Sequence, residues 1–427
     1  MARRQRAPAP AARPASRSKS RWQRDGWWTT ALAFAAPFAL YLRTLAPTIY
    51  NLDSAELTTA AATGGLVRAT GYPLYLLIGR VWSQLPFGDV GYRMNLLSAV
   101  CGALTVALGE RILRRLGVGV WARLAALGLL AVAQFFWALA LIAEVYTLHT
   151  AILAGVILAL LRWSERPTPA RLALATFLMG IGFGNHVATV LAAPGCLWFV
   201  LNAKPRKALE PRSLGLAAAG LAAGLAVYLY LPLVYLTRPE FNYVGSFNAS
   251  GQFEPVNLAT LQGLWWLVSG KVFAGVMMAY TTPELIREVG HFGAELVRAF
   301  MVIGIGPGLA GIVVAWRRSR AVGGLLVLVF VISAAFYINY RVVDKDTMFL
   351  PAYLVWALWV GIGYQWLIDW AAHPSAAVRP GAARASVYVL RAVMAGAVVF
   401  ALSWNWPLAD LSDDWSARPA MAGRPSR

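Results

Sequence analysis

The stretch Tyr50-Asn51-Leu52-Asp53-Ser54-Ala55-Glu56-Leu57 places two carboxylates just after the first long apolar segment of the chain, residues 27–46. Such charges are scarce here, because 59% of the 427 residues are hydrophobic and only 13% are charged. Apolar segments of about 20 residues, the length of a membrane-spanning helix, recur along the rest of the chain. The sequence therefore predicts an all-α polytopic membrane protein, with Asp53 and Glu56 as its first candidate catalytic residues.

The positions of Lys and Arg predict how the chain threads the membrane, since cytoplasmic loops carry an excess of both. Residues 1–26 are rich in Arg, Ala, Pro and Ser, so we expect a disordered, basic cytoplasmic tail. Segment 27–46 is then a first span and anchor, and it delivers Asp53 and Glu56 to the outer face. About eleven spans are predicted, at residues 27–46, 92–113, 120–140, 147–161, two within 172–201, 214–236, 292–316, 322–340, 348–368 and 386–404.

Two stretches do not fit simple spans. Residues 73–85 are too short to cross a bilayer, so we expect a helix that lies in the interface. Together with a helix around residues 54–66, it makes the first outer loop, 47–91, a platform with two interfacial helices. Residues 172–201 are short for two crossings, so broken helices that turn near residues 182–186 are expected.

The transmembrane domain is thus expected to cover residues 27–406, with a large outer loop at 237–290 and a short outer-face tail at 407–427. The net charge of +19 comes mainly from the tail and short loops, so it indicates topology rather than nucleic-acid binding. The cysteines Cys101 and Cys196 lie in apolar stretches without metal-ligand spacing, which favours neither a zinc site nor a disulfide. Frequent Ala, Arg and Gly are typical of a GC-rich bacterial genome, so the bacterial cytoplasmic membrane is the expected location.

Ionisable residues from distant parts of the chain reach the same predicted face of the membrane. They are Asp53, Glu56, Glu144, His186, Asp344, Lys345 and Asp346. Any one of them alone could simply be an interfacial residue in contact with water. Their convergence on one face favours a functional site.

Asp53 suits the role of general base, because a carboxylate at the lipid–water boundary can accept a proton from a hydroxyl nucleophile. Glu56 lies three residues further on and would share a helix face with Asp53, which it could orient or whose pKa it could raise. A purely structural alternative is that Asp53 caps the helix and Glu56 completes a capping box.

Outer-side cations could hold a lipid phosphate beside these acids. The candidates are Arg68, Arg93, Arg238, Lys271, Arg341 and Lys345. Arg93 ranks first, because it lies where the first outer loop enters a span. Most of the others are expected to be ordinary headgroup contacts.

Several motifs follow one another in an order that resembles a known family. They are Pro47-Thr48, Asp53-Ser54-Ala55-Glu56-Leu57, Gly71-Tyr72-Pro73-Leu74-Tyr75, Pro86-Phe87-Gly88, Tyr92-Arg93-Met94-Asn95-Leu96-Leu97-Ser98, Ala143-Glu144-Val145-Tyr146, Asn185-His186, Tyr230-Leu231-Pro232-Leu233, Thr260-Leu261-Gln262-Gly263, Ser269-Gly270-Lys271 and residues 344–351. The order of segments resembles the C-type glycosyltransferases (GT-C), and within them the chain resembles the DUF2723 family of protein O-mannosyltransferase-like proteins. The resemblance runs from about Thr44 to the C-terminus.

The resemblance implies transfer of a sugar, with mannose expected, from a polyprenyl-phosphate donor to a hydroxyl acceptor on the outer face. It implies Asp53 as the base, inversion at the anomeric carbon, and no obligatory cofactor or metal, the lipid-linked sugar being a substrate. Expected partners are membrane lipid and a protein or glycan acceptor. Candidate donor-phosphate or substrate-binding residues are Arg68, Tyr72, Arg93, Glu144, His186, Lys271, Asp344 and Asp346.

The chain departs from the family pattern at two places. Ala55 stands where relatives usually have Gly, and Arg68-Ala69-Thr70 stands where they have His-Pro-Pro. Arg68 could itself bind phosphate there. Two alternative functions stay open, a transporter or flippase of a lipid-linked precursor, whose charges should lie near the bilayer midplane, and a noncatalytic scaffold that binds a partner through Trp-rich loops.

Overall fold

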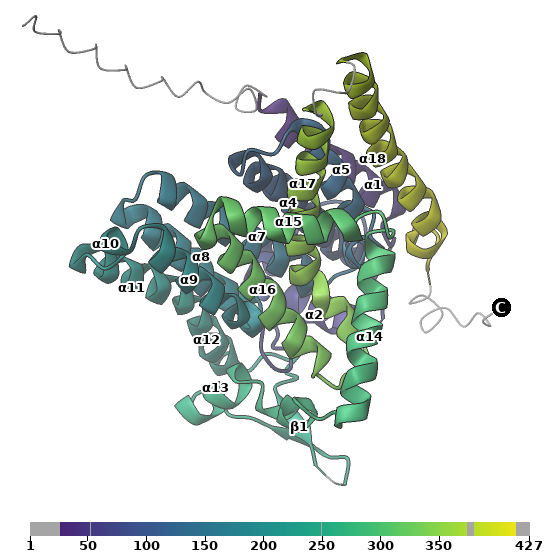
Figure 1. Cartoon of the computed structure of the whole chain (residues 1–427). Helices are drawn as coiled ribbons and strands as arrows, with labels where there is room; N and C mark the ends of the chain where they lie inside the picture. Colours follow the sequence, from purple (N-terminus) through teal and green to yellow (C-terminus); the bar gives the residue numbers. More distant parts are fainter. Residues whose placement is uncertain (1–25, 52, 249, 374–379, 416–427) are drawn as a thin grey trace, which may run out of the picture.

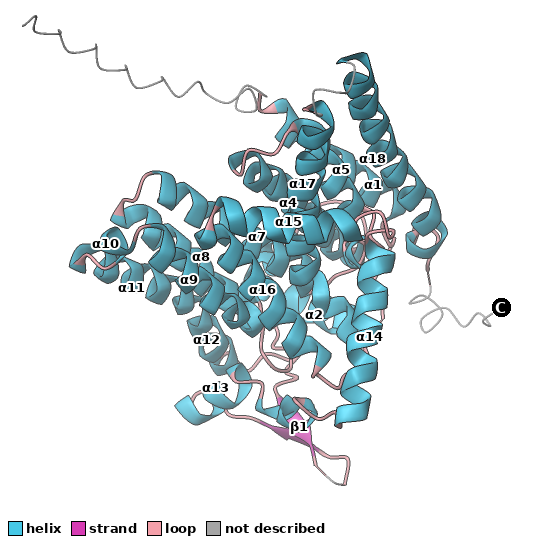
Figure 2. Cartoon of the chain, in the orientation of Figure 1, coloured by secondary structure: helices cyan, strands magenta, loops and turns pink. Residues whose placement is uncertain are grey.

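The computed structural model describes residues 26–51, 53–248, 250–373 and 380–415. Within them nearly all regular structure is helical, and the strands form one small hairpin (Figures 1 and 2). The predicted tail at residues 1–26 lies outside this part of the chain except for Gly26. The end of the tail predicted at 407–427 also lies outside it.

Among the described residues, six helices are long and apolar enough to cross a membrane. They are α4 (Val90–Arg115), α7 (Val145–Glu165), the run of α11 (Pro211–Leu225), η3 (Ala226–Leu229) and α12 (Tyr230–Leu236), α16 (Arg320–Ile338), η5 (Lys345–Phe349) with α17 (Leu350–Ala372), and α18 (Pro380–Ala409). The chain is therefore an integral membrane protein with the predicted all-α architecture.

Shorter helices precede and separate these six. They include α1 (Trp28–Thr44), α5 (Val120–Ala131), α6 (Gln134–Leu139), α8 (Pro169–Asn185), η2 (Val187–Ala192), α9 (Ala193–Ala203) and α10 (Pro205–Ala208). The break between α8 and η2 falls at His186, inside the turn predicted at residues 182–186. The span predicted at 120–140 is divided between α5 and α6. The total of eleven spans stays a prediction.

The span predicted at residues 292–316 is wrong. The chain there forms two helices, α14 (Thr282–Ala299) and α15 (Ile305–Arg318). Between them the backbone leaves the helical region, with φ of 51° at Met301 and 54° at Val302. Helix α14 is amphipathic, with charged residues on one face and apolar residues on the other, so its sequence fits a surface helix better than a span.

Helix α17 lies at the centre of the bundle. In an apolar 18-residue segment of η5–α17, 94% of the residues are buried inside the protein. The corresponding share is 11% for the α11–α12 run and 17% for α18. These last two elements lie at opposite edges of the molecule (Figure 1). Their exposed Leu, Val and Phe side chains are those expected of helices that face lipid.

The first predicted outer loop holds two short helices, α2 (Asp53–Thr63) and α3 (Pro73–Trp82), close to the predicted positions. The large loop, 237–290, holds the hairpin of β1 (Gly245–Phe247) and β2 (Phe253–Pro255), then α13 (Leu261–Val268) and η4 (Lys271–Val276). Backbone hydrogen bonds join the two loops, from Leu66 N to Phe241 O (2.9 Å) and from Tyr243 N to Leu66 O (2.9 Å).

Helices α4 and α7 run in the same direction and define two ends of the bundle. The start of α4 is tied to the first loop, because Asn95 donates hydrogen bonds to the carbonyls of Ala46 and Thr48, both at 2.9 Å. At the other end, Arg115 of α4 pairs with Glu165 of α7. We call the end with Asp53 and the start of α7 the site end, and the opposite one the arginine end.

Candidate active site

Asp53 and Glu56 both lie in the first turn of α2, where the helix dipole favours negative charge. Three residues apart, they share one face of the helix. Arg68, from the loop after α2, reaches both of them. Its Nη2 forms an ion pair with Asp53, its Nε lies 3.4 Å from Glu56 Oε2, and its backbone N–H donates to Glu56 Oε1 at 2.8 Å.

Two carboxylates share one guanidinium here, so the charges of Asp53, Glu56 and Arg68 cancel only in part. Burial raises the pKa of Glu56, and the N–H and charge of Arg68 counteract that rise. Burial lowers the pKa of Arg68, but Asp53 and Glu56 outweigh this and raise it overall. Both Glu56 oxygens are engaged by Arg68, so Glu56 positions the arginine beside Asp53.

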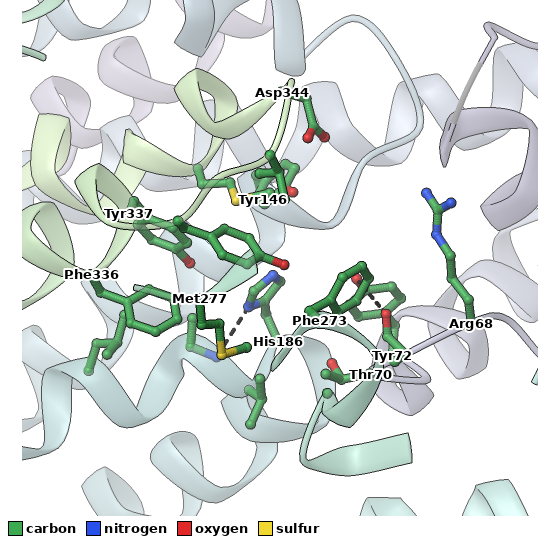
Figure 3. A pocket seen from close by; sticks show the side chains of 18 of the residues that line it. Arg68, Thr70, Tyr72, Tyr146, His186, Phe273, Met277, Phe336, Tyr337 and Asp344 are labelled. Carbon is green, nitrogen blue, oxygen red and sulfur yellow. Dashed lines mark hydrogen bonds between the residues drawn. The ribbon is translucent and has the colours of Figure 1, made fainter. Parts of the chain in front are cut away.

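A cavity of about 560 Å³ opens beside Asp53 and Arg68. One part of its wall is apolar, and other lining residues carry charge or a hydroxyl group. The apolar and aromatic lining residues include Val190, Leu191, Phe273, Met277, Phe336 and Tyr337, and the polar ones include Asp53, Arg68, Tyr72, His186, Tyr340, Arg341 and Asp344. In Figure 3, Phe336, Tyr337 and Met277 lie on one side of His186 and Arg68 lies on the other.

His186 stands in the middle of this lining (Figure 3). Its Nδ1 accepts a hydrogen bond from the N–H of Ala188 at 3.2 Å, so in the neutral ring the proton sits on Nε2. Burial lowers the pKa of His186 to about 4, which keeps the ring neutral near pH 7. Aromatic rings surround it, with centroids at 5.9 Å for Tyr72 and 5.7 Å for Tyr146. His186 can therefore offer one N–H donor from an aromatic setting.

Tyr72 is held in a left-handed backbone conformation, with φ of 41°, immediately before Pro73. A non-glycine residue adopts this region only when its surroundings hold it there. Here the ring stacks on His186 and the hydroxyl donates to the carbonyl of Ala69 at 3.4 Å. Burial raises the pKa of Tyr72, so the hydroxyl stays protonated.

Two further acids predicted for the site lie near Asp53. Asp344 lines the cavity, and burial raises its pKa. Glu144 is buried behind the wall, just before α7, and burial, then the charges of Asp53 and Asp344, raise its pKa. Ser54 of α2 holds the segment that carries Glu144 next to α2, because its hydroxyl accepts a hydrogen bond from the N–H of Ala143 at 3.2 Å.

Three predicted site residues lie apart from the cavity. Arg93 donates to the carbonyl of Leu85, so it braces the loop between α3 and α4. Lys271 follows the cavity residue Gly270 but is itself exposed. Asp346 pairs with His291 of α14 at 2.9 Å. Ranking Arg93 first among the phosphate-binding cations is therefore not supported by its position.

Other lining residues were missing from the predicted site. Tyr146 lies two residues after Glu144 in one of the motifs above. Tyr337 lies in the last turn of α16, and Tyr340 follows the helix, next to Arg341. Burial raises the pKa of Tyr340 to about 12. Tyrosines in apolar helices look like ordinary core residues in a sequence, so only their position marks them as lining. Among the described residues, no group of three or more His, Cys, Asp or Glu side chains is arranged as a metal site.

A second cavity, of about 430 Å³, lies beside the same two residues. Asp53 and Arg68 line it together with Ala55, Glu56, Thr59, Phe241 and Tyr243. The last two belong to the large loop, next to the hairpin. Asp53 and Arg68 therefore belong to the walls of both cavities.

Comparisons with known proteins found relatives named as protein O-mannosyl-transferases. Residues 53–209 match the family described as the protein O-mannosyl-transferase TMEM260 N-terminal domain. The chain is 29% identical to the mouse protein O-mannosyl-transferase TMEM260 over 230 residues, 52% of this chain and 33% of that protein. It is 22% identical to the Dictyostelium discoideum protein O-mannosyl-transferase tmem260 over 334 residues, 72% of this chain and 40% of that protein. The chain thus spans about a third to two fifths of the length of these curated relatives.

One solved structure is similar over most of the chain. It is ArnT from Cupriavidus metallidurans bound to undecaprenyl phosphate, with a TM-score of 0.56 and 15% identity, covering 92% of this chain and 78% of that one. The C-type glycosyltransferase fold predicted from the sequence is therefore confirmed. The chain combines this fold with a resemblance to the TMEM260 N-terminal domain over residues 53–209, the stretch that contains Asp53, Glu56, Arg68, Tyr72, Glu144 and His186.

Proposed function

We propose that the chain is a membrane glycosyltransferase that moves a sugar, with mannose expected, from a polyprenyl-phosphate donor to a hydroxyl acceptor. One observation carries the proposal: Asp53 and Arg68 stand together between two cavities. A transferase needs a base and a cation that meet a donor on one side and an acceptor on the other. The names of the relatives and the fold shared with ArnT bound to undecaprenyl phosphate support it.

The larger cavity suits the donor. A polyprenyl chain is hydrocarbon, and the wall of Val190, Leu191 and Phe336 offers apolar contacts to it. At the polar part of the same cavity, the planar guanidinium of Arg68 matches a phosphate geometrically. The Nε2–H of His186 is a further donor in this lining. The smaller cavity is then the entry for the acceptor hydroxyl.

The chemistry is a single displacement. Asp53 accepts the proton of the acceptor hydroxyl while its oxygen forms a bond to the anomeric carbon. The bond between the anomeric carbon and the phosphate oxygen breaks, and the electron pair leaves with polyprenyl phosphate. Arg68 stabilises the negative charge on that leaving group. Attack from the side opposite the leaving group inverts the anomeric carbon.

The proposal places the site on the outer face of a bacterial cytoplasmic membrane, with the N-terminus in the cytoplasm. The arginine end, opposite Asp53, fits the cytoplasmic side by the positive-inside rule. Membership of the DUF2723 family stays a prediction that agrees with this assignment.

The direct test uses the purified chain in lipid nanodiscs with polyprenyl-phosphate mannose labelled in the sugar. We expect label to move to a hydroxyl acceptor in a membrane extract, and none to move from a nucleotide-linked mannose. Movement of intact labelled lipid between leaflets of proteoliposomes, without a new glycosidic bond, would instead support the transporter. Binding of extract proteins with neither activity would support the scaffold.

The assignment of the donor cavity makes its own prediction. Val190 lines that cavity and is 46% exposed, so Val190→Trp should narrow the path of the lipid chain. We expect KM for a long-chain polyprenyl donor to rise about tenfold, since overpacking of this kind costs about 1–3 kcal/mol. A short, water-soluble isoprenyl donor should be affected much less. Steady-state kinetics with both donors measure the difference.

Val331→Trp is the matched control, because Val331 is similarly exposed (51%) on α16 but does not line the cavity. Equal KM changes in the two variants, or equal changes for the two donors, would contradict the assignment of the lipid chain to this cavity.

A further inference from the structure

Six arginines gather at the arginine end, far from Asp53. They come from the ends of α4 and α7 and from the start of α8, and they are Arg111, Arg114, Arg115, Arg162, Arg166 and Arg171. Three separate helices therefore bring guanidinium groups to one place.

These side chains surround two adjoining hollows of about 510 Å³ and 300 Å³. Arg115 and Glu165 line both of them. The larger hollow is completed by Ala159, Arg162, Arg166, Arg171 and Leu174, and the smaller by Arg111 and Arg114. We call the pair the arginine hollow.

Positive charge is in large excess there. Glu165 is the one carboxylate among the described residues that line the hollow, and it pairs with Arg115 at 2.6 Å from Nη1 to Oε1. Arg171 Nη1 donates to the carbonyl of Arg162 at 2.9 Å, which ties the start of α8 to the end of α7. Guanidinium groups therefore outnumber carboxylates among the described residues that line the hollow.

The general rules for placing cations in membrane proteins explain only part of this arginine cluster. Cytoplasmic loops favour arginine, and cations are stabilised at helix C-termini. Neither rule requires cations from three helices to face a common hollow. Mutual repulsion opposes such clustering, and a bound anion would relieve it.

The position of the hollow indicates what kind of anion fits. Helix α7 runs 21 residues from Val145, next to Glu144, to Glu165 in the wall of the hollow, which at 1.5 Å per residue is about 31 Å, close to the thickness of a bilayer core. The hollow therefore lies near the headgroups of the leaflet opposite the site end. Ala159 and Leu174, which is 48% exposed, add apolar surface beside the arginines.

We propose that the arginine hollow binds the phosphate headgroup of an anionic phospholipid, with a headgroup of two phosphates fitting the charge best. Basic pockets between membrane helices are suited to such headgroups. The arginines would donate charge-assisted hydrogen bonds to the phosphate oxygens, and the acyl chains would lie along Leu174. This site is independent of sugar transfer.

The test measures lipid binding to the full chain in detergent by native mass spectrometry, with cardiolipin and phosphatidylcholine as probes. We expect cardiolipin to bind the wild type and Arg162→Gln/Arg166→Gln to weaken it about 30-fold, from two lost charges. These two positions leave the pair of Arg115 with Glu165 intact. Phosphatidylcholine should bind weakly and equally to both forms.

Lys204→Gln/Arg206→Gln is the matched control, since it removes two exposed cations, one just before α10 and one within it, that lie outside the hollow. It should change cardiolipin binding less than twofold. A second variant, Glu165→Gln, removes the one acid and should tighten binding. Equal losses in the two double variants, or no gain with Glu165→Gln, would overturn the site.

A further arm distinguishes the source of the phosphate. Soluble pyrophosphate should fail to displace cardiolipin at equal concentration, because it lacks the acyl contacts. Full displacement would overturn the lipid assignment in favour of a free phosphate. Sugar transfer should be unchanged in Arg162→Gln/Arg166→Gln, so a failure of this site and a failure of the transferase are separate results.

Discussion

Replacing Asp53 with Asn is expected to lower sugar transfer about 10³-fold, because a positioned general base contributes about 10²–10⁴-fold to a rate. The amide keeps the shape of the side chain and can still contact both cavities, but it cannot accept the proton of the acceptor. Initial rates with labelled polyprenyl-phosphate donor measure the loss. It should appear in kcat, with little change in the KM for the donor.

The substitution should leave the fold intact. The ion pair of Asp53 with Arg68 is partly open to solvent, with the two side chains 29% and 43% exposed, and such pairs contribute at most about 1 kcal/mol. Thermal unfolding in detergent should therefore change little, so a loss of transfer can be assigned to chemistry.

Asp346→Asn is the control with the same chemical change. Asp346 lies in the first turn of η5, two residues after Asp344, but it pairs with His291 of α14 and does not line the cavity. Its transfer rate should stay within about twofold of the wild type, a typical effect outside a site. Wild-type transfer by Asp53→Asn would move the base elsewhere, with Asp344 the next acid in the lining.

The sequence predicted the first loop of the site well, because the information there is local. Two acids three residues apart mark the start of α2, and an apolar stretch too short for a span marks α3. Both signals lie within the helices themselves and do not depend on tertiary contacts. The number of predicted spans also placed Asp344 and His186 on the same side of the membrane as Asp53. The structure then brings both into one cavity with Asp53 and Arg68.

The sequence could not tell which cations and acids on the same side of the membrane line the cavity, because tertiary contacts decide this. Arg68 lies in the first loop and Arg93 in the first turn of α4 just after it, yet Arg93 donates to the Leu85 carbonyl and Arg68 pairs with Asp53. Likewise Asp344 and Asp346 are two residues apart, and α14 engages only the second. The missed break between α14 and α15 had a local signal, since the predicted span 292–316 contains Glu295 and Arg298, which continue a charged helix face that a span would not carry.

A buried charge pair inside the bundle was also absent from the sequence prediction. Glu110 of α4 and Arg123 of α5 are both fully buried, with 3.1 Å between Oε1 and Nε. Thr29 and Thr30 of α1 donate to the two Glu110 oxygens at 2.9 and 2.6 Å. Arg123 also donates to the carbonyl of Val118 at 2.6 Å. The pair and its hydrogen bonds therefore join α1, α4 and α5 near the arginine end.

Arg123→Met is expected to lower the free energy of unfolding by about 3–5 kcal/mol, because it leaves the Glu110 carboxylate buried without its cation. The double variant Glu110→Gln/Arg123→Met should lose much less, since a neutral polar group next to a methionine needs no counter-charge and the two threonines can still bond to the amide. Thermal and denaturant unfolding in detergent, with both single variants, complete the double-mutant cycle. If Arg123→Met and the double variant are equally destabilised, packing of the arginine stem rather than its charge holds α4 and α5 together. Sugar transfer per folded molecule should be unchanged in all of them, because the pair lies at the end opposite Asp53, which separates this stabilising contact from the site.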